Sequence, residues 1–135
     1  MKMFFNIPTL RKHKDKQKIF YRDLFNLEIS DNIESDDVRV RMYLCEKISN
    51  AYLLGDTESD HWVPILGFVI EKNFPSFCRK LQEENIKFIY GIKAYSSCLA
   101  KILDPCGNIL SIYCDDDTDE NGVDLNEIGI FKELS

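Results

Sequence analysis

The chain has 135 residues, 44% of them apolar, and a formal net charge of −6 at pH 7. This length and apolar content suit a single domain, or two small modules that share one core. The negative charge argues against a general affinity for nucleic acid, and no apolar run approaches the roughly 20 residues of a membrane-spanning helix. We therefore expect a globular protein with neither nucleic acid nor a membrane as its partner.

The cysteines and the first residues of the sequence indicate the cellular compartment of the protein. Five cysteines include no CxxC pair, so they do not suggest a disulfide framework, and Cys106, in a turn, is expected to be the most exposed of them. The opening stretch MKMFFNIPTLRKHKDK places its apolar part before its basic run, whereas a secretory signal carries its charges first. These features predict a cytoplasmic location.

The first half of the chain is predicted to fold as a strand, a helix and three strands. The helix covers about Asp15–Phe25 and should end at Asn26, because asparagine readily adopts the left-handed conformation that closes a helix. Alternation is clearest in the strand over 38–46, where Val40, Met42 and Leu44 share one face. The strands of this half are expected at residues 3–10, 27–29, 38–46 and 51–54.

The second half repeats this order after a polar, turn-rich connection at residues 55–61. A helix should begin after Asn73, which is expected to cap it, and should end at Asn85. Its apolar stripe is predicted to contain Phe74, Phe77, Cys78 and Leu81. Strands are expected at residues 64–70, 86–92, 98–103 and 109–113, and equivalent residues of the two halves lie 57 to 59 positions apart.

A tight turn precedes the last of these strands. Asp-Pro at its start and Gly-Asn at its end make DPCGN, residues 104–108, a turn sequence. In the strand that follows, Ser111 shares one face with Ile109 and Tyr113, so a lone hydroxyl lies within an otherwise apolar strand.

The repeated order, the stretch FYRDLFNLEI (20–29) and the stretch LDPCGNILSIY (103–113) resemble the vicinal oxygen chelate superfamily of glyoxalase, bleomycin resistance and ring-cleaving dioxygenase proteins. Asn26 stands where the family usually has glycine, and Cys106 where it usually has aspartate. The resemblance, over residues 3–114, implies an α+β fold in which two paired βαβββ modules form an open, curled mixed sheet around a cleft. We expect modules at 1–56 and 62–114, followed by an acidic linker and a short C-terminal helix in 115–135.

The family's enzymes often hold a divalent cation in this cleft, with His and Glu ligands on four strands. By position, the resemblance places these ligands at Asn6, near Ile65 and at Ser111, with the fourth in 51–56, where Asp56 is the carboxylate. An amide, an aliphatic chain and a hydroxyl supply neither charge nor a strong donor. We therefore predict no metal and no other cofactor at this site.

Two other stretches of the sequence contain possible metal ligands. Residues 117–128, DTDENGVDLNEI, resemble a calcium-binding loop, but the final position that needs a bidentate Glu holds Ile128. A solvated acidic linker is favoured, and calcium binding stays open. His61, near Glu58 and Asp60, is a weak zinc candidate because the chain has only two histidines.

Aromatic and guanidinium groups give the expected cleft its character. If Val40 and Met42 pack beneath the helices, the residues that alternate with them face the cleft; the opposite phase remains possible. Such a surface suits a small planar or anionic molecule. The predicted ligand-binding residues are Asn6, Arg39, Arg41, Tyr43, Trp62, Ser111 and Tyr113.

We interpret the chain as a metal-free, homodimeric binding protein that sequesters a small molecule without transforming it. One alternative is a metal-dependent glyoxalase-like lyase, isomerase or dioxygenase that recruits Glu46, Asp56 or His61. A second is a protein-interaction module whose cleft is filled by its own side chains and whose acidic tail meets a basic partner.

Overall fold

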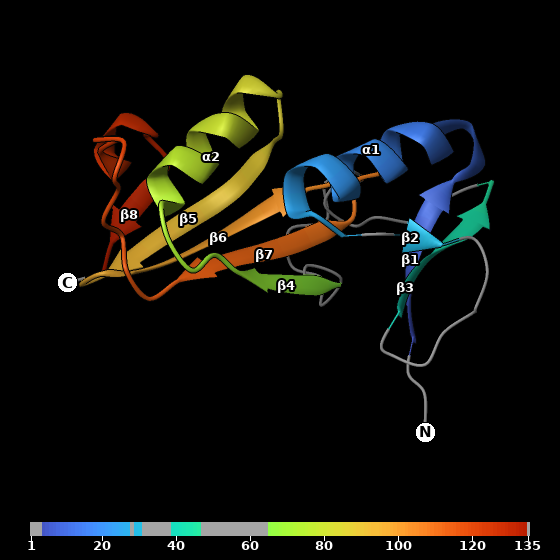
Figure 1. The fold of residues 1–135 in the computed structure, drawn as a ribbon, viewed down its shortest axis with the longest axis horizontal. Helices are drawn as coiled ribbons and strands as arrows, with labels where there is room; N and C mark the ends of the chain where they lie inside the picture. Colours follow the sequence, from blue (N-terminus) through green and yellow to red (C-terminus); the bar gives the residue numbers. More distant parts are fainter. Residues whose placement is uncertain (1–3, 28, 31–38, 47–64, 135) are drawn as a thin grey trace. The chain divides into compact units, whose positions relative to one another are not determined.

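The computed structural model describes residues 4–27, 29–30, 39–46 and 65–134. The chain forms two compact units. Unit 1 comprises Met1–Trp62 together with Asp104–Asn108, and unit 2 comprises Val63–Leu103 and Ile109–Ser135. Their elements are labelled in Figure 1. The turn DPCGN, although it is late in the sequence, thus belongs to unit 1.

Unit 1 contains one helix and a small parallel sheet. Its elements are β1 (Phe4–Leu10), a short 3-10 turn (Arg11–His13), α1 (Lys14–Phe25), β2 (Ile29–Ser30) and β3 (Arg39–Cys45). The strand order is β1-β3-β2, and both pairings are parallel. Asn26 closes α1 with a φ of 53°, as predicted. The strand expected at residues 51–54 lies outside the described residues.

The core of unit 1 combines one face of its sheet with α1. Ile7 and Met42, from neighbouring strands, are buried, as are Phe20 and Tyr21 of the helix. The rings of Phe20 and Tyr21 meet edge-on with their centroids 4.9 Å apart. Met42 is buried while Tyr43 is 55% exposed, so the predicted alternation is confirmed at these two positions.

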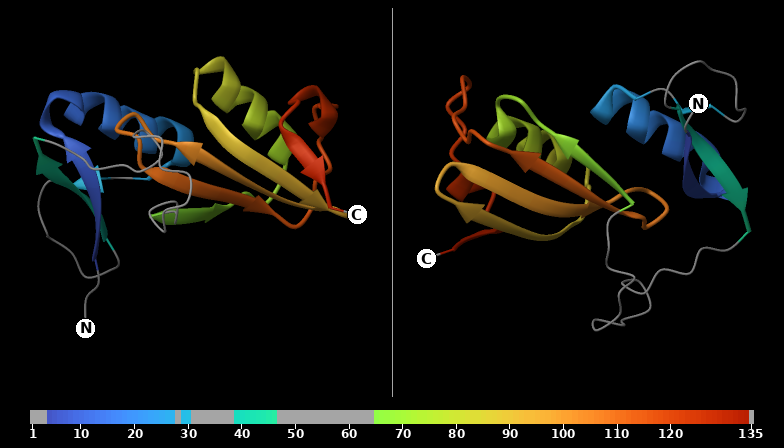
Figure 2. Two further views of the ribbon diagram at one scale, coloured as in Figure 1. Left: turned by 180° about the vertical axis from the view of Figure 1, so that it is seen from behind. Right: turned by 90° about the horizontal axis from the view of Figure 1, so that it is seen from below.

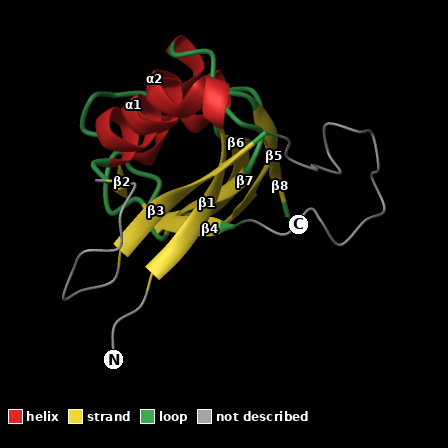
Figure 3. Ribbon diagram, turned by 90° about the vertical axis from the view of Figure 1, so that its right-hand side faces the viewer, coloured by secondary structure: helices red, strands yellow, loops and turns green. Residues whose placement is uncertain are grey.

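Unit 2 is a five-stranded mixed sheet with one helix on one face (Figures 1 and 3). The strand order is β4-β7-β6-β5-β8, with antiparallel pairs in the β5-β6-β7 part and parallel pairs at both edges. β8 lies beside β5 at one edge, as Figure 2 shows. The elements are β4 (Leu66–Val69), α2 (Phe74–Glu83), β5 (Phe88–Ala94), β6 (Ser97–Leu103), β7 (Ile109–Cys114), a 3-10 turn (Leu125–Glu127) and β8 (Phe131–Glu133).

The apolar stripe of α2 packs on small residues of the sheet. Phe74, Cys78 and Leu81 are buried, which confirms the predicted stripe at these positions. Beneath them Gly91 pairs with Ala100, and a Cβ on Gly91 would lie 2.7 Å from the Phe131 ring. The absence of a side chain at Gly91 therefore lets Phe131 pack over the sheet, where its ring also meets that of Phe74 at 5.7 Å.

The C-terminal tail differs from the predicted linker and helix. Only residues 125–127 form a helical turn, and Phe131–Glu133 form β8 instead. Gly129 takes a φ of 83°, which interrupts a helix and lets the following residues pair with β5. The apolar residues Leu125, Ile128 and Phe131 recur every three positions, but they do not form one face of a helix: Leu125 and Ile128 are buried in the 3-10 turn region, and Phe131 is paired in the sheet.

The acidic part of the tail caps α2. Asn73 occupies the N-cap position but makes no side-chain cap hydrogen bond. Instead, Asp119 accepts hydrogen bonds from the Ser76 N–H at 2.7 Å and from the Ser76 hydroxyl at 2.8 Å. Asn73 holds Glu120, since its Oδ1 accepts from the Glu120 N–H at 2.8 Å. Asp117 pairs with Lys93 at 2.9 Å, so Asp117 and Asp119, the first two aspartates of the calcium-like stretch, already have protein partners.

Because of this cap, we expect the ionisation of Asp119 to make the stability of the fold depend on pH. Burial alone would raise the pKa of Asp119, but hydrogen bonds from Ser76, Asn121 and Val123 together lower it. The folded pKa is therefore below the unfolded one, and the stabilisation is present above the unfolded pKa and lost as the pH falls through the folded pKa. Thermal unfolding of Asp119→Asn should show a weaker loss of stability on acidification than the wild type; parallel curves would contradict the capping role.

Candidate ligand-binding face

Within the described residues of unit 2, no helix covers the face of the five-stranded sheet opposite α2. On β7, Ile112 and Cys114 point toward α2 and are buried, whereas Ser111 and Tyr113 alternate with them and are half-buried on the other face. We call this second surface the open face of unit 2. The open face carries two of the residues predicted from the sequence, Ser111 and Tyr113.

Four residues lie side by side across the middle of the open face. Ser111 is paired with Gly67 on β4 and with Lys101 on β6, and Lys101 is paired with Tyr90 on β5. We call them the serine row. The Lys101 amine lies 5.2 Å from the centroid of the Tyr90 ring, a cation–π distance. Gly67 contributes no side chain and its Cβ position is 3.9 Å from the Ser111 Cβ, so the row has a notch beside the hydroxyl.

The neighbouring row is apolar. Tyr113 is flanked by Val69 on β4 and Leu99 on β6, and Leu99 is paired with Ile92 on β5. Val69 is 66% exposed, which is unusual for an aliphatic side chain in a sheet. The Tyr113 hydroxyl donates to the Asp115 carboxylate, and this hydrogen bond raises the pKa of Tyr113. The two rows together combine apolar surface, two aromatic rings, one hydroxyl and one ammonium group.

The other predicted site residues lie in unit 1 or outside the described residues. Asn6 and Arg41 are register partners on β1 and β3, and Pro8 and Tyr43 are partners two residues further along. Asn6 and Tyr43 are exposed. The backbone of Arg39 begins β3, opposite Phe4. Trp62 lies outside the described residues.

The donor set of the open face does not fit a divalent metal ion. Ser111, at the position where the family's last-strand Glu was expected, offers a neutral hydroxyl, and its neighbour Gly67 offers no side chain. Lys101, its other neighbour, carries a positive charge that would repel a divalent ion. Within the described part of the chain, no group of three or more His, Cys, Asp or Glu side chains is placed to hold a metal ion.

A buried polar cluster in unit 1 anchors the DPCGN turn. Asp104 is only 4% exposed, and its Oδ2 accepts hydrogen bonds from Gln17 at 2.9 Å, Tyr21 at 2.7 Å and the Asn108 side chain at 2.8 Å. Its Oδ1 accepts from the backbone N–H groups of Cys106 and Asn108, both at 2.9 Å. Five hydrogen bonds on one buried carboxylate give the cluster a structural role.

Electrostatics within this cluster favour a protonated tyrosine. Burial and next the nearby Asp104 carboxylate raise the pKa of Tyr21 well above its usual range, so its hydroxyl remains a donor. Cys106, expected to be the most exposed cysteine, is 4% exposed, and burial raises its pKa to about 11. That expectation was wrong because the turn is held against β1, where Asn108 donates to the Pro8 carbonyl at 2.7 Å.

Sequence reasoning missed Lys101 and Tyr90. Both could have been found by counting outward from the DPCGN turn, because a hairpin closed by Asp104 and Asn108 places Leu103 opposite Ile109 and Lys101 opposite Ser111. Tyr90 then requires the register of β5 with β6, which a bulge between Phe88 and Tyr90 shifts. That shift carries no clear sequence signal.

Comparisons with known proteins agree with this architecture. No family model matches the sequence, and a search of curated proteins finds no significant match. Among solved structures, a glyoxalase/dioxygenase from Nostoc punctiforme is similar with a TM-score of 0.58 and 16% identity, over 82% of this chain and 88% of that chain. UcmS2 is similar with a TM-score of 0.55 and 15% identity, over 87% of this chain and 98% of that chain. The predicted α+β class and the resemblance are thus confirmed at the level of architecture: the chain has the fold of the vicinal oxygen chelate superfamily.

Proposed function

We propose that the protein binds a small planar anion on the open face of unit 2 and does not transform it. The observation that carries this proposal is the serine row, in which a notch at Gly67 and the Ser111 hydroxyl lie beside the Lys101 ammonium group. An ammonium group and a hydroxyl can both donate to a carboxylate or phenolate oxygen. No residue of this row offers an anionic metal ligand.

The apolar row supports a planar body for the ligand. Leu99, Val69 and the Tyr113 ring present flat, partly exposed apolar surface next to the charged row. Desolvating this surface favours binding by roughly 25 cal/mol for each Å² removed from water. A ligand with an aromatic body and one anionic group therefore matches the two rows together.

The same arrangement supports binding without chemistry. In unit 2 the open face lacks a carboxylate or imidazole among its row residues to act as a general base, and the Ser111 hydroxyl has neither as a register neighbour. Among the described residues, no helix is long and apolar enough to cross a membrane. We propose a carrier or scavenger of a small molecule, and we include in this proposal a cytoplasmic location and a homodimeric state.

Replacing Lys101 with methionine should test the anion directly. Lys101→Met keeps the length of the side chain and removes its charge, so we expect naphthalene carboxylate to bind about tenfold more weakly, because a hydrogen bond to a charged group contributes roughly 1.5 to 3 kcal/mol. Naphthalene methanol, a neutral analogue, should bind equally to both proteins. Isothermal titration calorimetry measures both affinities.

The matched control is Lys80→Met, which removes an exposed lysine from α2 on the other face of the sheet. This control should leave both affinities unchanged. Equal losses in the two variants would indicate a general charge effect, and turnover of a catechol or of methylglyoxal hemithioacetal that stops on chelation would favour the enzyme instead.

A further inference from the structure

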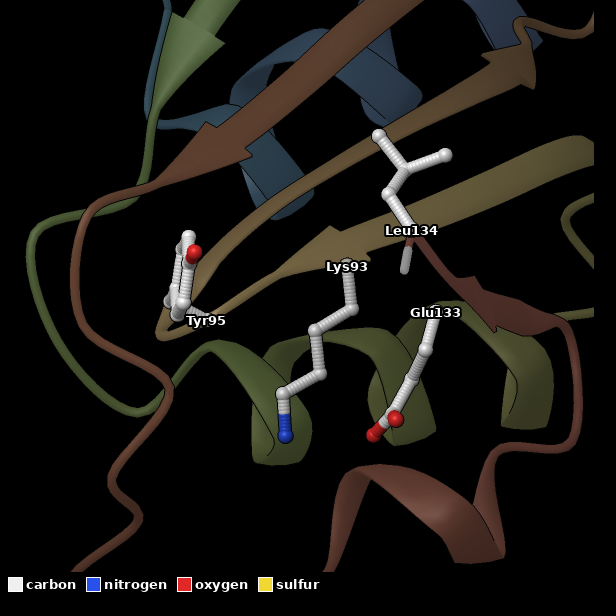
Figure 4. A pocket seen from close by; sticks show the side chains of 4 residues that line it. All are labelled: Lys93, Tyr95, Glu133 and Leu134. Carbon is white, nitrogen blue, oxygen red and sulfur yellow. The ribbon is translucent and has the colours of Figure 1, made fainter.

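A surface hollow of about 350 Å³ lies at the far end of β5 and β8, and no part of the proposed function uses it. It is lined by Lys93, Tyr95, Glu133 and Leu134 (Figure 4). Lys93 and Glu133 are register partners whose side chains run side by side, while Leu134 extends in the opposite direction from Glu133. The Leu134 N–H donates to the Lys93 carbonyl at 2.8 Å, which fixes this wall of the hollow.

Tyr95 occupies a turn position at which a tyrosine does not stabilise the fold. It is the first of two residues in the hairpin turn between β5 and β6, and its φ of 59° belongs to a region in which glycine or asparagine is favoured. Its side chain is 98% exposed, so the ring gains almost no burial within the chain. A bulky ring held in a disfavoured conformation without internal packing is a reason to look for a partner outside the chain.

The second wall is also apolar and open. Leu134 is 60% exposed and stands at the other side of the hollow. A tyrosine ring and a leucine side chain together offer a site for the aliphatic stem and planar head of one long side chain.

The charges around the hollow are mostly negative. The Ser96 hydroxyl donates to the Asp115 carbonyl at 2.9 Å, and Lys93 pairs with Asp117 at 2.9 Å, so the acidic run that contains Asp116 is fastened beside the turn. Glu133 makes no ion pair within 4 Å of another described residue, but, after the Asp117 hydrogen bond, its charge helps to raise the pKa of the Lys93 ammonium group. At this edge of the sheet, Lys93 and Lys132 supply two positive charges. The carboxylates at positions 115, 116, 117 and 133 supply four negative charges.

From these features we infer that the hollow docks an arginine side chain of a basic peptide segment in a protein partner. A guanidinium group stacks on a tyrosine ring and pairs with a carboxylate at the same time, whereas an ammonium group offers no flat surface for stacking. The exposed Tyr95 ring supplies the stacking surface, Glu133 supplies a carboxylate and Leu134 supplies the contact for the arginine stem. This surface is separate from the serine row, so it can hold a protein partner whether or not the open face binds a small molecule.

Replacing Tyr95 with asparagine separates folding from docking. Asparagine tolerates positive φ, so Tyr95→Asn should raise the melting temperature while it removes the stacking surface. The probe is a capped pentapeptide, glycine-arginine-leucine-arginine-glycine. Its binding is measured by two-dimensional amide NMR of the protein. We expect shifts at residues 93–97 and 131–134 in the wild type, affinity that falls about tenfold in Tyr95→Asn, and weaker binding at high salt.

Matched probes and variants make the outcome decisive. Glu133→Gln should weaken the peptide, whereas Glu83→Gln, an exposed glutamate at the end of α2, should not. The same peptide with citrulline in place of arginine, which is neutral, should not bind. The inference would be overturned if the citrulline peptide or free ethylguanidine bound as tightly as the arginine peptide. It would also be overturned by unchanged peptide affinity in Tyr95→Asn, or by self-association of the protein that Tyr95→Asn abolishes.

Discussion

Gly67→Val is expected to weaken ligand binding strongly while leaving the fold at least as stable as the wild type. Gly67 has ordinary space around it, with its Cβ position 3.9 Å from the Ser111 Cβ, and it takes no positive φ. Valine is favoured in strands and glycine is not, so the free energy of unfolding should rise by about 0.5 to 1 kcal/mol. The branched side chain would fill the notch, and we expect affinity for naphthalene carboxylate to fall about a hundredfold, or ~2.8 kcal/mol.

This variant is informative because its two effects have opposite signs. A variant that merely damages the sheet would lose stability and binding together. Gly67→Ala, which fills only part of the notch, should give an intermediate loss of affinity by calorimetry and a smaller gain in stability by denaturant unfolding. Undiminished affinity in Gly67→Val would show that the ligand does not bind at the notch.

Asp104→Ala is expected to be the most destabilising single change in unit 1. The substitution leaves the Tyr21 hydroxyl, the Gln17 amide and two backbone N–H groups without their buried acceptor. Each unsatisfied buried donor costs roughly 1 to 3 kcal/mol, and because the losses are not additive we expect a total of about 3 to 5 kcal/mol. Denaturant unfolding followed by circular dichroism measures this loss.

A graded series keeps this prediction testable if Asp104→Ala does not fold. Tyr21→Phe removes one hydrogen bond to the carboxylate and should cost about 1 to 2 kcal/mol. Asp116→Ala removes an exposed aspartate that accepts from the nearby Thr118 and should leave stability nearly unchanged. Equal effects of Tyr21→Phe and Asp116→Ala would contradict the structural role of the cluster.

The cluster also has a pH signature opposite to that of Asp119. Burial raises the pKa of Asp104, and hydrogen bonds from Asn108, Tyr21 and Cys106 lower it only in part. Because the folded pKa is above the unfolded one, the linked stabilisation is present below the unfolded pKa and is lost as the pH rises through the folded pKa. Asp104→Asn should remove this component from the pH dependence of unfolding.

Local signals in the sequence predicted the elements well. The two helices and their ends follow from asparagine and from apolar spacing: Asn26 and Asn85 both take positive φ beyond the helices they close, and Asn73 precedes α2. Alternation along β3 and β7 predicted opposite faces for Met42 and Tyr43 and for Ser111 and Ile112, as their burial shows. Such features depend on residues close together in the chain.

Features that depend on distant partners were predicted less well. The Asp119 cap joins residues 43 apart, and the Tyr21 contact with Asp104 joins residues 83 apart, so neither has a local signature. The exposure of Cys106 was predicted wrongly because its burial depends on β1, the distant strand against which its turn packs. Lys101 lies opposite Ser111 through the hairpin register of β6 and β7, which alternation along a single strand does not define.

The most direct test of the central claim is a two-dimensional amide NMR titration of the wild-type protein with naphthalene carboxylate in the presence of a chelator. Binding on the open face predicts saturable shifts at Gly67, Lys101 and Ser111 that Lys101→Met and Gly67→Val suppress. Shifts confined to other parts of the chain, or shifts at these residues that require an added divalent ion, would contradict a metal-free binding face.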